Sequence, residues 1–129
     1  MTRAPIQVLI VDDEPLARRH LRTVLEADTD VVVAGEAANG SEAIRMIEDL
    51  SPDLVLLDVQ MPEIDGFSVV AQLDPNRLPV IVFVTAHDSY ALKAFDVHAV
   101  DYVLKPVARD RLLQAVTRAK TRLASSDAA

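Results

Sequence analysis

The sequence predicts an α/β fold, an open and doubly wound sheet of five parallel strands with helices packed on both faces. Two features of the 129 residues indicate this class: five short apolar segments recur along the chain, and segments with one apolar helical face separate them. Continuous apolar runs rich in β-branched residues are typical of strands buried on both faces, as in a parallel sheet. Right-handed crossovers between such strands place helices over both faces of the sheet.

The predicted strands recur at intervals along the sequence, and prolines fall mainly in the connections between them. We expect the strands at residues 8–11, 31–34, 54–57, 80–84 and 102–104. The pattern itself does not encode the strand order. For five strand–helix units the usual arrangement is the flavodoxin-like order 2-1-3-4-5, and we expect this order.

Each predicted helix is marked by apolar residues that recur three or four positions apart. These stripes run through residues 17–25, 43–50, 67–73, 91–95 and 112–123. Pro15 suits the first turn of the first helix, and Asp13 is a plausible N-cap before it. Beyond Leu123 the residues are small and polar. We therefore expect one domain over residues 1–123 and a tail or the start of a linker at residues 124–129.

The composition excludes several classes of function. The chain has no cysteine, which rules out thiol catalysis, thiolate metal sites and disulfides and fits a reducing compartment. No signal peptide is evident, and no apolar run approaches the ~20 residues that a membrane-spanning helix needs. We therefore expect a soluble, cytoplasmic protein with no membrane contact.

The net charge of −7, from 20 acidic and 13 basic residues, disfavours binding to the phosphates of nucleic acids. The charge is unevenly distributed, because residues 1–58 hold twelve acids and five bases whereas residues 105–122 hold six bases and one acid. One face of the fold is thus expected to be acidic and the last helix basic. The basic helix is either a solvated face or a contact for an acidic surface, and both interpretations stay open.

Polar residues follow four of the five predicted strands, at the point where each strand ends. They are Asp12 and Asp13 after the first strand, Asp58 after the third, Thr85 after the fourth and Lys105 after the fifth. In an open α/β sheet, ligands bind outside the carboxyl ends of the strands, where the strand order switches. Each residue alone is more often a cap or a loop residue. Their coincidence at one edge of one sheet predicts a site.

The chemistry of these residue types indicates phosphoryl transfer. Crowded carboxylates repel one another, and Mg²⁺, which takes oxygen ligands, relieves that repulsion. A carboxylate flanked by Mg²⁺, an ammonium and a hydroxyl is equipped to attack phosphorus. The same groups then neutralise the oxygens of the transferred phosphoryl group.

Four segments of the chain resemble the receiver domain of bacterial two-component response regulators. They are Val8–Glu14, Leu56–Gly66, Val84–Ala86 and Tyr102–Pro106, and they occur in the family's order. The resemblance extends over roughly residues 6–123. The stretch Tyr90–Tyr102 is similar, more particularly, to receivers of the LytTR-type (LytR/AlgR-like) subgroup, which precede a DNA-binding domain.

The resemblance implies a Mg²⁺-dependent phosphorylation site. Asp58 would accept the phosphoryl group from a sensor histidine kinase. Asp13 would bind Mg²⁺ directly and Asp12 through water, while Asp58 and the backbone carbonyl of Gln60 would complete the protein ligands. Gln60 and His87 stand where the family tunes the lifetime of the phosphorylated state, because their side chains border the path of the attacking water.

The resemblance also implies a switch that reads the phosphoryl group. Thr85 and Lys105 would contact the phosphoryl oxygens and act with Asp58 as the catalytic residues. Tyr102 would be the switch aromatic, which moves inward when Thr85 is drawn to the phosphate. The peptide bond between Lys105 and Pro106 would be cis.

The expected function is therefore a phosphorylation-activated signalling switch used in transcriptional regulation. Phosphorylation would change the surface formed by the fourth helix, fifth strand and fifth helix and so control an output domain or a partner. A homodimer through this surface is a further expectation, because the basic last helix stands against Asp96 and Asp101. DNA would be bound only through a downstream LytTR-type domain absent from these 129 residues. The domain would catalyse only its own phosphotransfer and a slow autodephosphorylation.

Two other classes explain the sequence less well. A small Mg²⁺ phosphatase of the haloacid-dehalogenase type would need a second acid two residues after the nucleophile, where this chain has Gln60. A phosphate-binding flavodoxin-like module would need a glycine-rich loop. The only glycines, Gly35, Gly40 and Gly66, form none.

Overall fold

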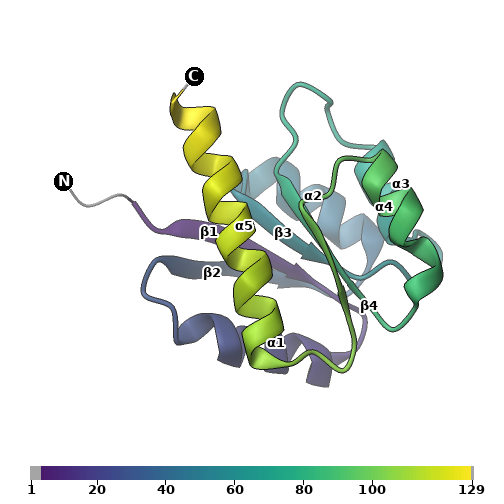
Figure 1. The fold of residues 1–129 in the computed structure, drawn as a ribbon. Coiled ribbons are helices and arrows are strands. Elements are labelled where there is room, and N and C mark those ends of the chain that lie inside the picture. The colour runs from purple at the N-terminus through teal and green to yellow at the C-terminus, as the bar shows by residue number, and fades with distance from the viewer. Residues whose placement is uncertain (1–3, 129) are drawn as a thin grey trace.

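Apolar segments form the strands of one parallel sheet, in a computed structural model that describes residues 4–128 (Figure 1). The strands are β1 (Ile6–Val11), β2 (Val31–Ala37), β3 (Leu54–Leu57), β4 (Val80–Thr85) and β5 (Asp101–Leu104). Their order is β2-β1-β3-β4-β5, which confirms the prediction. β1 pairs on one side with β2 and on the other with β3, so the chain reverses its direction of winding between β1 and β3.

Two layers of helices cover the sheet. The helices are α1 (Pro15–Glu26), α2 (Gly40–Leu50), α3 (Gly66–Ala71), α4 (Ala91–Asp96) and α5 (Arg109–Ala128), with a short 3₁₀ helix η1 (Asp88–Tyr90) before α4. The side chains of β1 alternate between the faces: Val8 and Ile10 join the core under α1 and α5, whereas Leu9 and Val11 join the core under α2, α3 and α4. Figure 1 shows α5 crossing one face of the sheet with α2 behind it.

Side-chain caps begin two of the helices. Asn39 accepts a hydrogen bond from the backbone of Glu42 at 2.8 Å and starts α2, and Asp65 accepts one from Ser68 at 2.8 Å and starts α3. The prediction that Asp13 caps the first helix is wrong. The N-cap of α1 is Glu14, without a side-chain cap bond, and Asp12 Oδ1 instead accepts from the Glu14 N–H at 2.9 Å.

The last helix is longer than the sequence pattern predicted. The expected tail at residues 124–129 begins as helix, because α5 continues to Ala128, while residue 129 lies outside the described residues. No glycine or proline interrupts residues 124–128, and alanine is the strongest helix former, so nothing there ends the helix. The domain boundary at residue 123 stays a prediction.

The fourth helix meets the core less than predicted. Of the apolar residues of α4, Ala94 is buried, whereas Leu92 is 84% exposed and Phe95 79% exposed. The stripe expected along residues 91–95 therefore meets the core only at Ala94. A helix of only six residues beside the edge strand β5 has little area to pack against the sheet, so it buries few side chains. Among the described residues, no helix has both the length and the apolar composition that would let it span a membrane.

Candidate functional site

Four carboxylates come together at the carboxyl ends of β1 and β3. Asp12, Asp13, Glu14 and Asp58 each offer an oxygen, and these oxygens all lie within 4.8 Å of one another. Asp12 and Asp58 are buried, while Asp13 and Glu14 are exposed. The adjacency of β1 and β3 produces this cluster, since each strand delivers its acids to the same edge of the sheet.

The loop after β3 folds tightly around Asp58. The N–H of Asp58 donates to the carbonyl of Val11 at 3.0 Å, which continues the sheet ladder to the end of β1. The N–H of Gly66 donates to the carbonyl of Val59 at 2.8 Å. A Cβ at Gly66 would lie 2.5 Å from the carbonyl oxygen of Asp58, so only glycine permits this approach.

Lys105 brings the positive charge of the site. Its ammonium lies 2.8 Å from Asp12 Oδ2, 3.2 Å from Glu14 Oε1 and 3.3 Å from Asp58 Oδ2. The N–H of Lys105 donates to the carbonyl of Thr85 at 2.8 Å, which holds the ends of β4 and β5 together. The following peptide bond to Pro106 is cis, as expected. Glu14, to which the sequence analysis gave no role, thus takes part in the cluster, and its position directly after the acid pair was the available signal.

The cluster carries more negative charge than Lys105 can balance. Burial raises the pKa of Asp58, and the neighbouring charge of Asp12 raises it further, although Lys105 opposes both effects. Burial alone would lower the pKa of Lys105, but the hydrogen bond to Asp12 and the charges of Asp58 and Asp12 outweigh it and raise that pKa. One ammonium among four carboxylates leaves a site that favours a further cation.

A buried oxygen at this edge, Oγ1 of Thr85, has no hydrogen-bond partner among the described residues, whereas Oδ2 of Asp12, which is also buried, has the ammonium of Lys105 at 2.8 Å as its partner. Buried polar groups normally find partners, so an unpartnered hydroxyl at this site calls for a ligand. A divalent cation suits the carboxylate oxygens, and an anionic oxygen suits the hydroxyl and the ammonium. The residues present therefore fit Mg²⁺ and a phosphoryl group.

The two side chains expected beside the water path lie at the rim of this site. The backbone N–H of Gln60 donates to Asp58 Oδ1 at 3.2 Å, and its side-chain amide donates to the hydroxyl of Tyr90 at 3.1 Å. His87 is exposed, and its ring meets the ring of Tyr90 edge-on at 6.1 Å. Sequence reasoning assigned no role to Tyr90, and no pattern in the chain signals its contact with Gln60.

Tyr102, the expected switch residue, lies half-buried on the strand next to that of Thr85. Its hydroxyl donates to the carbonyl of His87, in the segment that leaves β4. The ring packs against the core under α2, α3 and α4, and burial raises the pKa of its hydroxyl. Tyr102 is therefore turned toward the site edge here.

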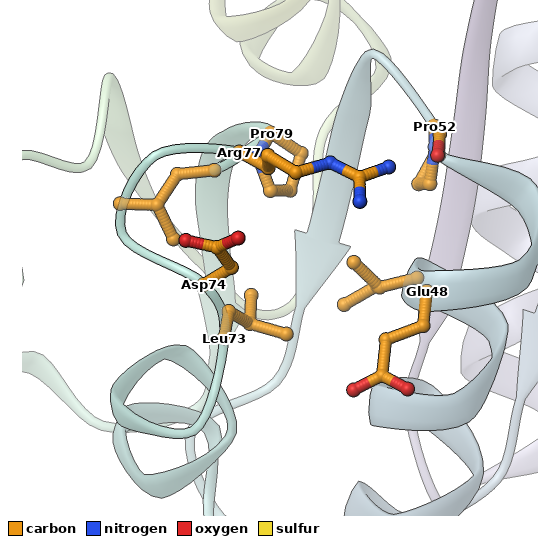
Figure 2. A pocket seen from close by; sticks show the side chains of 9 residues that line it. Glu48, Pro52, Leu73, Asp74, Arg77 and Pro79 are labelled. Atoms are coloured by element: carbon orange, nitrogen blue, oxygen red, sulfur yellow. The ribbon is translucent and has the colours of Figure 1, made fainter.

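One hollow of the surface lies away from this site. A hollow of about 310 Å³ opens between the end of α2 and the loop before β4, at the amino ends of the strands (Figure 2). Figure 2 shows it lined by Glu48, Pro52, Leu73, Asp74, Arg77 and Pro79. None of the predicted site residues lines it. The arrangement of charge, rather than the size of a hollow, identifies the candidate site.

Comparison with known proteins shows the family to which this chain belongs. The chain matches the family described as response regulator receiver domain over residues 8–117. The transcriptional regulatory protein BtsR of Escherichia coli K12 is 48% identical over 122 residues, which cover 95% of this chain and 51% of that protein. A response regulatory protein of Shewanella oneidensis is 49% identical over 115 residues, which cover 89% of this chain and 49% of that protein. The chain thus spans about half the length of these curated relatives.

Solved structures show the same fold. The receiver domain of the response regulator AraT from Geobacillus stearothermophilus has a TM-score of 0.85 and 30% identity, with 95% of this chain and 98% of that chain covered. The receiver domain of NarL from Mycobacterium tuberculosis has a TM-score of 0.82 and 34% identity, with 92% and 98% covered. A complex of CheX and CheY with BeF₃ and Mg²⁺ from Borrelia burgdorferi has a TM-score of 0.79 and 26% identity, with 88% and 87% covered. With the family match extending over most of its length, this chain belongs to the receiver domain family of the response regulators.

Proposed function

We propose that this receiver domain is switched by phosphorylation of Asp58 by a sensor histidine kinase in the cytoplasm. The observation that carries the proposal is the setting of Asp58, which is buried within a cluster of four carboxylates and lies 3.3 Å from the ammonium of Lys105. Asp12 and Asp13, from the neighbouring strand end, supply the other charges that such a site needs. The lack of cysteine in the sequence fits a cytoplasmic setting.

The transfer step requires one new bond and one broken bond. A carboxylate oxygen of Asp58 attacks the phosphorus of a phosphohistidine while the P–N bond breaks and its electron pair returns to the imidazole. The ammonium of Lys105 and the unpartnered hydroxyl of Thr85 donate to the oxygens of the group in transfer. Slow attack of water on the same phosphorus returns the free carboxylate, so the domain catalyses only its own modification.

Asp12, Asp13, Asp58 and the backbone carbonyl of Gln60 are the proposed Mg²⁺ ligands. The bound cation offsets the negative charge of the carboxylates and of the phosphoryl oxygens. Glu14, whose side chain is 67% exposed and lies 3.2 Å from the ammonium of Lys105, is not among the proposed ligands. A CheY complex to which this chain is similar names both BeF₃ and Mg²⁺, which supports the proposal.

Acetyl phosphate, a small phosphodonor, tests this chemistry without a kinase. One phosphate per chain is expected by mass spectrometry when Mg²⁺ is present and none when it is chelated. An acyl phosphate is cleaved by hydroxylamine, so the added mass should disappear on that treatment. A product that resists hydroxylamine, or one that forms without a divalent cation, would contradict the proposal.

Thr85 and Tyr102 are proposed to transmit the phosphorylated state. When the Thr85 hydroxyl turns to the phosphoryl group, the space that it leaves favours the inward position of the Tyr102 ring, so phosphorylation shifts a population of two rotamers. The hydrogen bond from Tyr102 to the His87 carbonyl is a contact that the inward rotamer can keep. In a double-mutant cycle on the phosphorylation response, losses from Thr85→Ala and Tyr102→Ala should not add. Full additivity would contradict the coupling.

The output is proposed to be transcriptional regulation through a LytTR-type DNA-binding domain that follows this receiver. The support is the segment Tyr90–Tyr102 and the length of the curated relatives, of which this chain spans about half. Neither the names of those relatives nor the solved receivers, which come from regulators such as NarL, favour the LytTR subgroup. Reading the gene beyond codon 129 tests the proposal, and any other kind of output domain there would contradict it.

A homodimer through α4, β5 and α5 is also proposed, on grounds that differ from those offered by the sequence. The charge of Asp101 is not available to a partner molecule, because Arg111 and Arg118 of the same chain already pair with it. The support comes instead from Leu92, Phe95 and Leu104, which are exposed large apolar residues of this face. Sedimentation with beryllofluoride, which mimics the phosphoryl group, should show association that Phe95→Ser weakens. A monomer at high concentration would contradict the dimer.

A further inference from the structure

The aromatic ring of Tyr90 is fixed in place at the rim of the site. It meets the ring of Phe67 edge-on at 5.9 Å, and Phe67 in turn packs on Phe83 at 4.8 Å. Phe83 is fully buried on β4, and Phe67 is only 5% exposed. The hydroxyl of Tyr90 is therefore held at one position relative to the core, even though it stands at the surface of the domain.

Gln60 is held to that hydroxyl. Its side-chain amide donates to Tyr90 Oη at 3.1 Å, and its backbone N–H donates to Asp58 Oδ1 at 3.2 Å. Gln60 is thus held at its backbone by the carboxylate of Asp58 and at the end of its side chain by the hydroxyl of Tyr90. An exposed glutamine side chain without such a partner samples many rotamers, and some of them turn the amide toward Asp58.

We propose that Tyr90 is a positioning residue that holds the amide of Gln60 away from Asp58 and so lengthens the life of the phosphorylated state. The inference rests on the proposed phosphorylation of Asp58. In the hydrolysis, a water oxygen forms a bond to phosphorus while the bond from phosphorus to the Asp58 oxygen breaks. The electron pair of that bond returns to the carboxylate, and the proton of the water leaves with the phosphate product.

A free glutamine amide next to this bond favours the reaction. It carries both a donor and an acceptor, so it can hold a water molecule and orient its oxygen toward phosphorus. While its N–H donates to Tyr90, at the end of η1, the amide is held there and is not free to turn to the bond at Asp58. Tyr90 thereby keeps an orienting group off the path of the attacking water.

Tyr90→Phe is the variant that isolates this effect, because it removes the hydroxyl and keeps the ring that packs on Phe67. We expect the phosphorylated variant, prepared with acetyl phosphate and Mg²⁺, to lose phosphate about two- to tenfold faster than the wild type, the range of one net hydrogen bond. The measurement is the decay of the phosphorylated mass after the phosphodonor is removed. An unchanged or slower decay would overturn the inference.

The dependence on Gln60 separates positioning from a general loosening of the loop. Gln60→Ala sets a decay rate of its own, and Tyr90→Phe added to it should not accelerate the decay beyond that rate. Gln72→Ala, which removes an exposed amide at the end of α3, is the matched control, and Tyr90→Phe should accelerate decay fully in that background. Equal acceleration with and without Gln60 would overturn the inference.

The same experiment distinguishes a failure of this inference from a failure of the proposed function. If acetyl phosphate adds no phosphate to the wild type, or adds it equally to Asp58→Asn, the phosphorylation site itself is wrong and the inference falls with it. If phosphate is added to Asp58 and the decay rates do not depend on Tyr90, only the positioning role is wrong.

Discussion

Two aspartates of this domain have equally shielded side chains that face cations, yet their surroundings move their pKa values in opposite directions. The side chains of Asp58 and Asp101 are each 6% exposed. Burial alone would raise the pKa of Asp101, but two hydrogen bonds from Arg111 at 2.7 and 2.9 Å, with the further charge of Arg118, lower it. Burial raises the pKa of Asp58, and Asp12 adds to that effect.

Since the two side chains are equally exposed to solvent, the feature that separates them is the balance of charge. Asp101 has two guanidinium partners to itself, whereas Asp58 shares one ammonium with two other acids. The negative charge of Asp101 is fully balanced by arginines of the same chain, so this ion pair stabilises the fold without a ligand. An unbalanced acid needs something that the chain does not supply, and that need marks the site for a cation and for a reaction.

The largest expected difference between the two aspartates is in phosphorylation. Asp58→Asn should abolish the addition of phosphate from acetyl phosphate and Mg²⁺, because an amide cannot form the acyl phosphate. Asp101→Asn should be phosphorylated to the wild-type extent. Mass spectrometry of the intact proteins gives the measurement, and peptide mapping locates the phosphate. Wild-type levels of phosphate on Asp58→Asn would show that Asp58 is not the phosphorylated residue.

Metal affinity should distinguish the same two regions. Asp13→Ala should weaken Mg²⁺ binding by at least about tenfold, because the ion loses a charged ligand. Asp12→Ala should weaken it less, since a water-mediated ligand is partly replaced by solvent. Asp101→Asn should bind Mg²⁺ as the wild type does. The chain has no tryptophan, so calorimetry or NMR provides the titration. An unchanged affinity in Asp13→Ala would contradict the ligand assignment.

The comparison also predicts opposite effects on stability in the absence of Mg²⁺. Asp58→Asn should raise the free energy of unfolding, because it removes a charge that its neighbours repel. Asp101→Asn should lower it by about 1–2 kcal/mol, the loss of charge-assisted hydrogen bonds discounted for the partial exposure of the arginines. Urea denaturation at neutral pH measures both values. A loss of stability in Asp58→Asn would mean that Lys105 balances the cluster after all.

The ionised forms of the two aspartates should also have opposite effects on how the free energy of unfolding depends on pH. For Asp58 the folded-state pKa lies above the unfolded value, so its charge destabilises the fold at neutral pH, and the cost is relieved as the pH falls through the raised pKa. For Asp101 the folded-state pKa is lowered, so its contribution is lost as the pH falls through that lowered value. On acidification without Mg²⁺, the stability of the wild type should approach that of Asp58→Asn and then decline. A constant difference between the two proteins would contradict the raised pKa.

Much of the site was predictable from the sequence, because strand ends in a parallel sheet meet at one edge. Asp12, Asp13 and Asp58 were assigned to this edge from the strand pattern and the expected order alone, and the structure brings them together. The fold followed from the same pattern, since short apolar runs with helical stripes between them permit few other topologies.

The contacts that were not predictable depend on side-chain geometry across elements. The sequence predicts that the bases of the last helix meet Asp96 and Asp101 of a second molecule, whereas Arg111 pairs with Asp101 of its own chain. The hydrogen bond between Gln60 and Tyr90 joins two loops through rotamers that no spacing encodes. The exposure of Phe95 follows from the shortness of α4 beside an edge strand, which a stripe of three apolar residues could not reveal.

The smallest expected effect is that of Arg118→Ala, and it tests whether balance is what distinguishes the two aspartates. The side chain of Arg118 is 60% exposed and lies 3.1 Å from Asp101, so the pair contributes only ~0–1 kcal/mol. Asp101 would still hold two hydrogen bonds from Arg111, which alone matches its single charge. Stability should therefore fall by less than about 1 kcal/mol, and phosphorylation should be unchanged. Arg111→Ala removes both hydrogen bonds to Asp101, so it should lower the free energy of unfolding, measured by urea denaturation, more than Arg118→Ala does. If the two losses are equal, Asp101 depends on the summed charge of α5 and not on one complete pair.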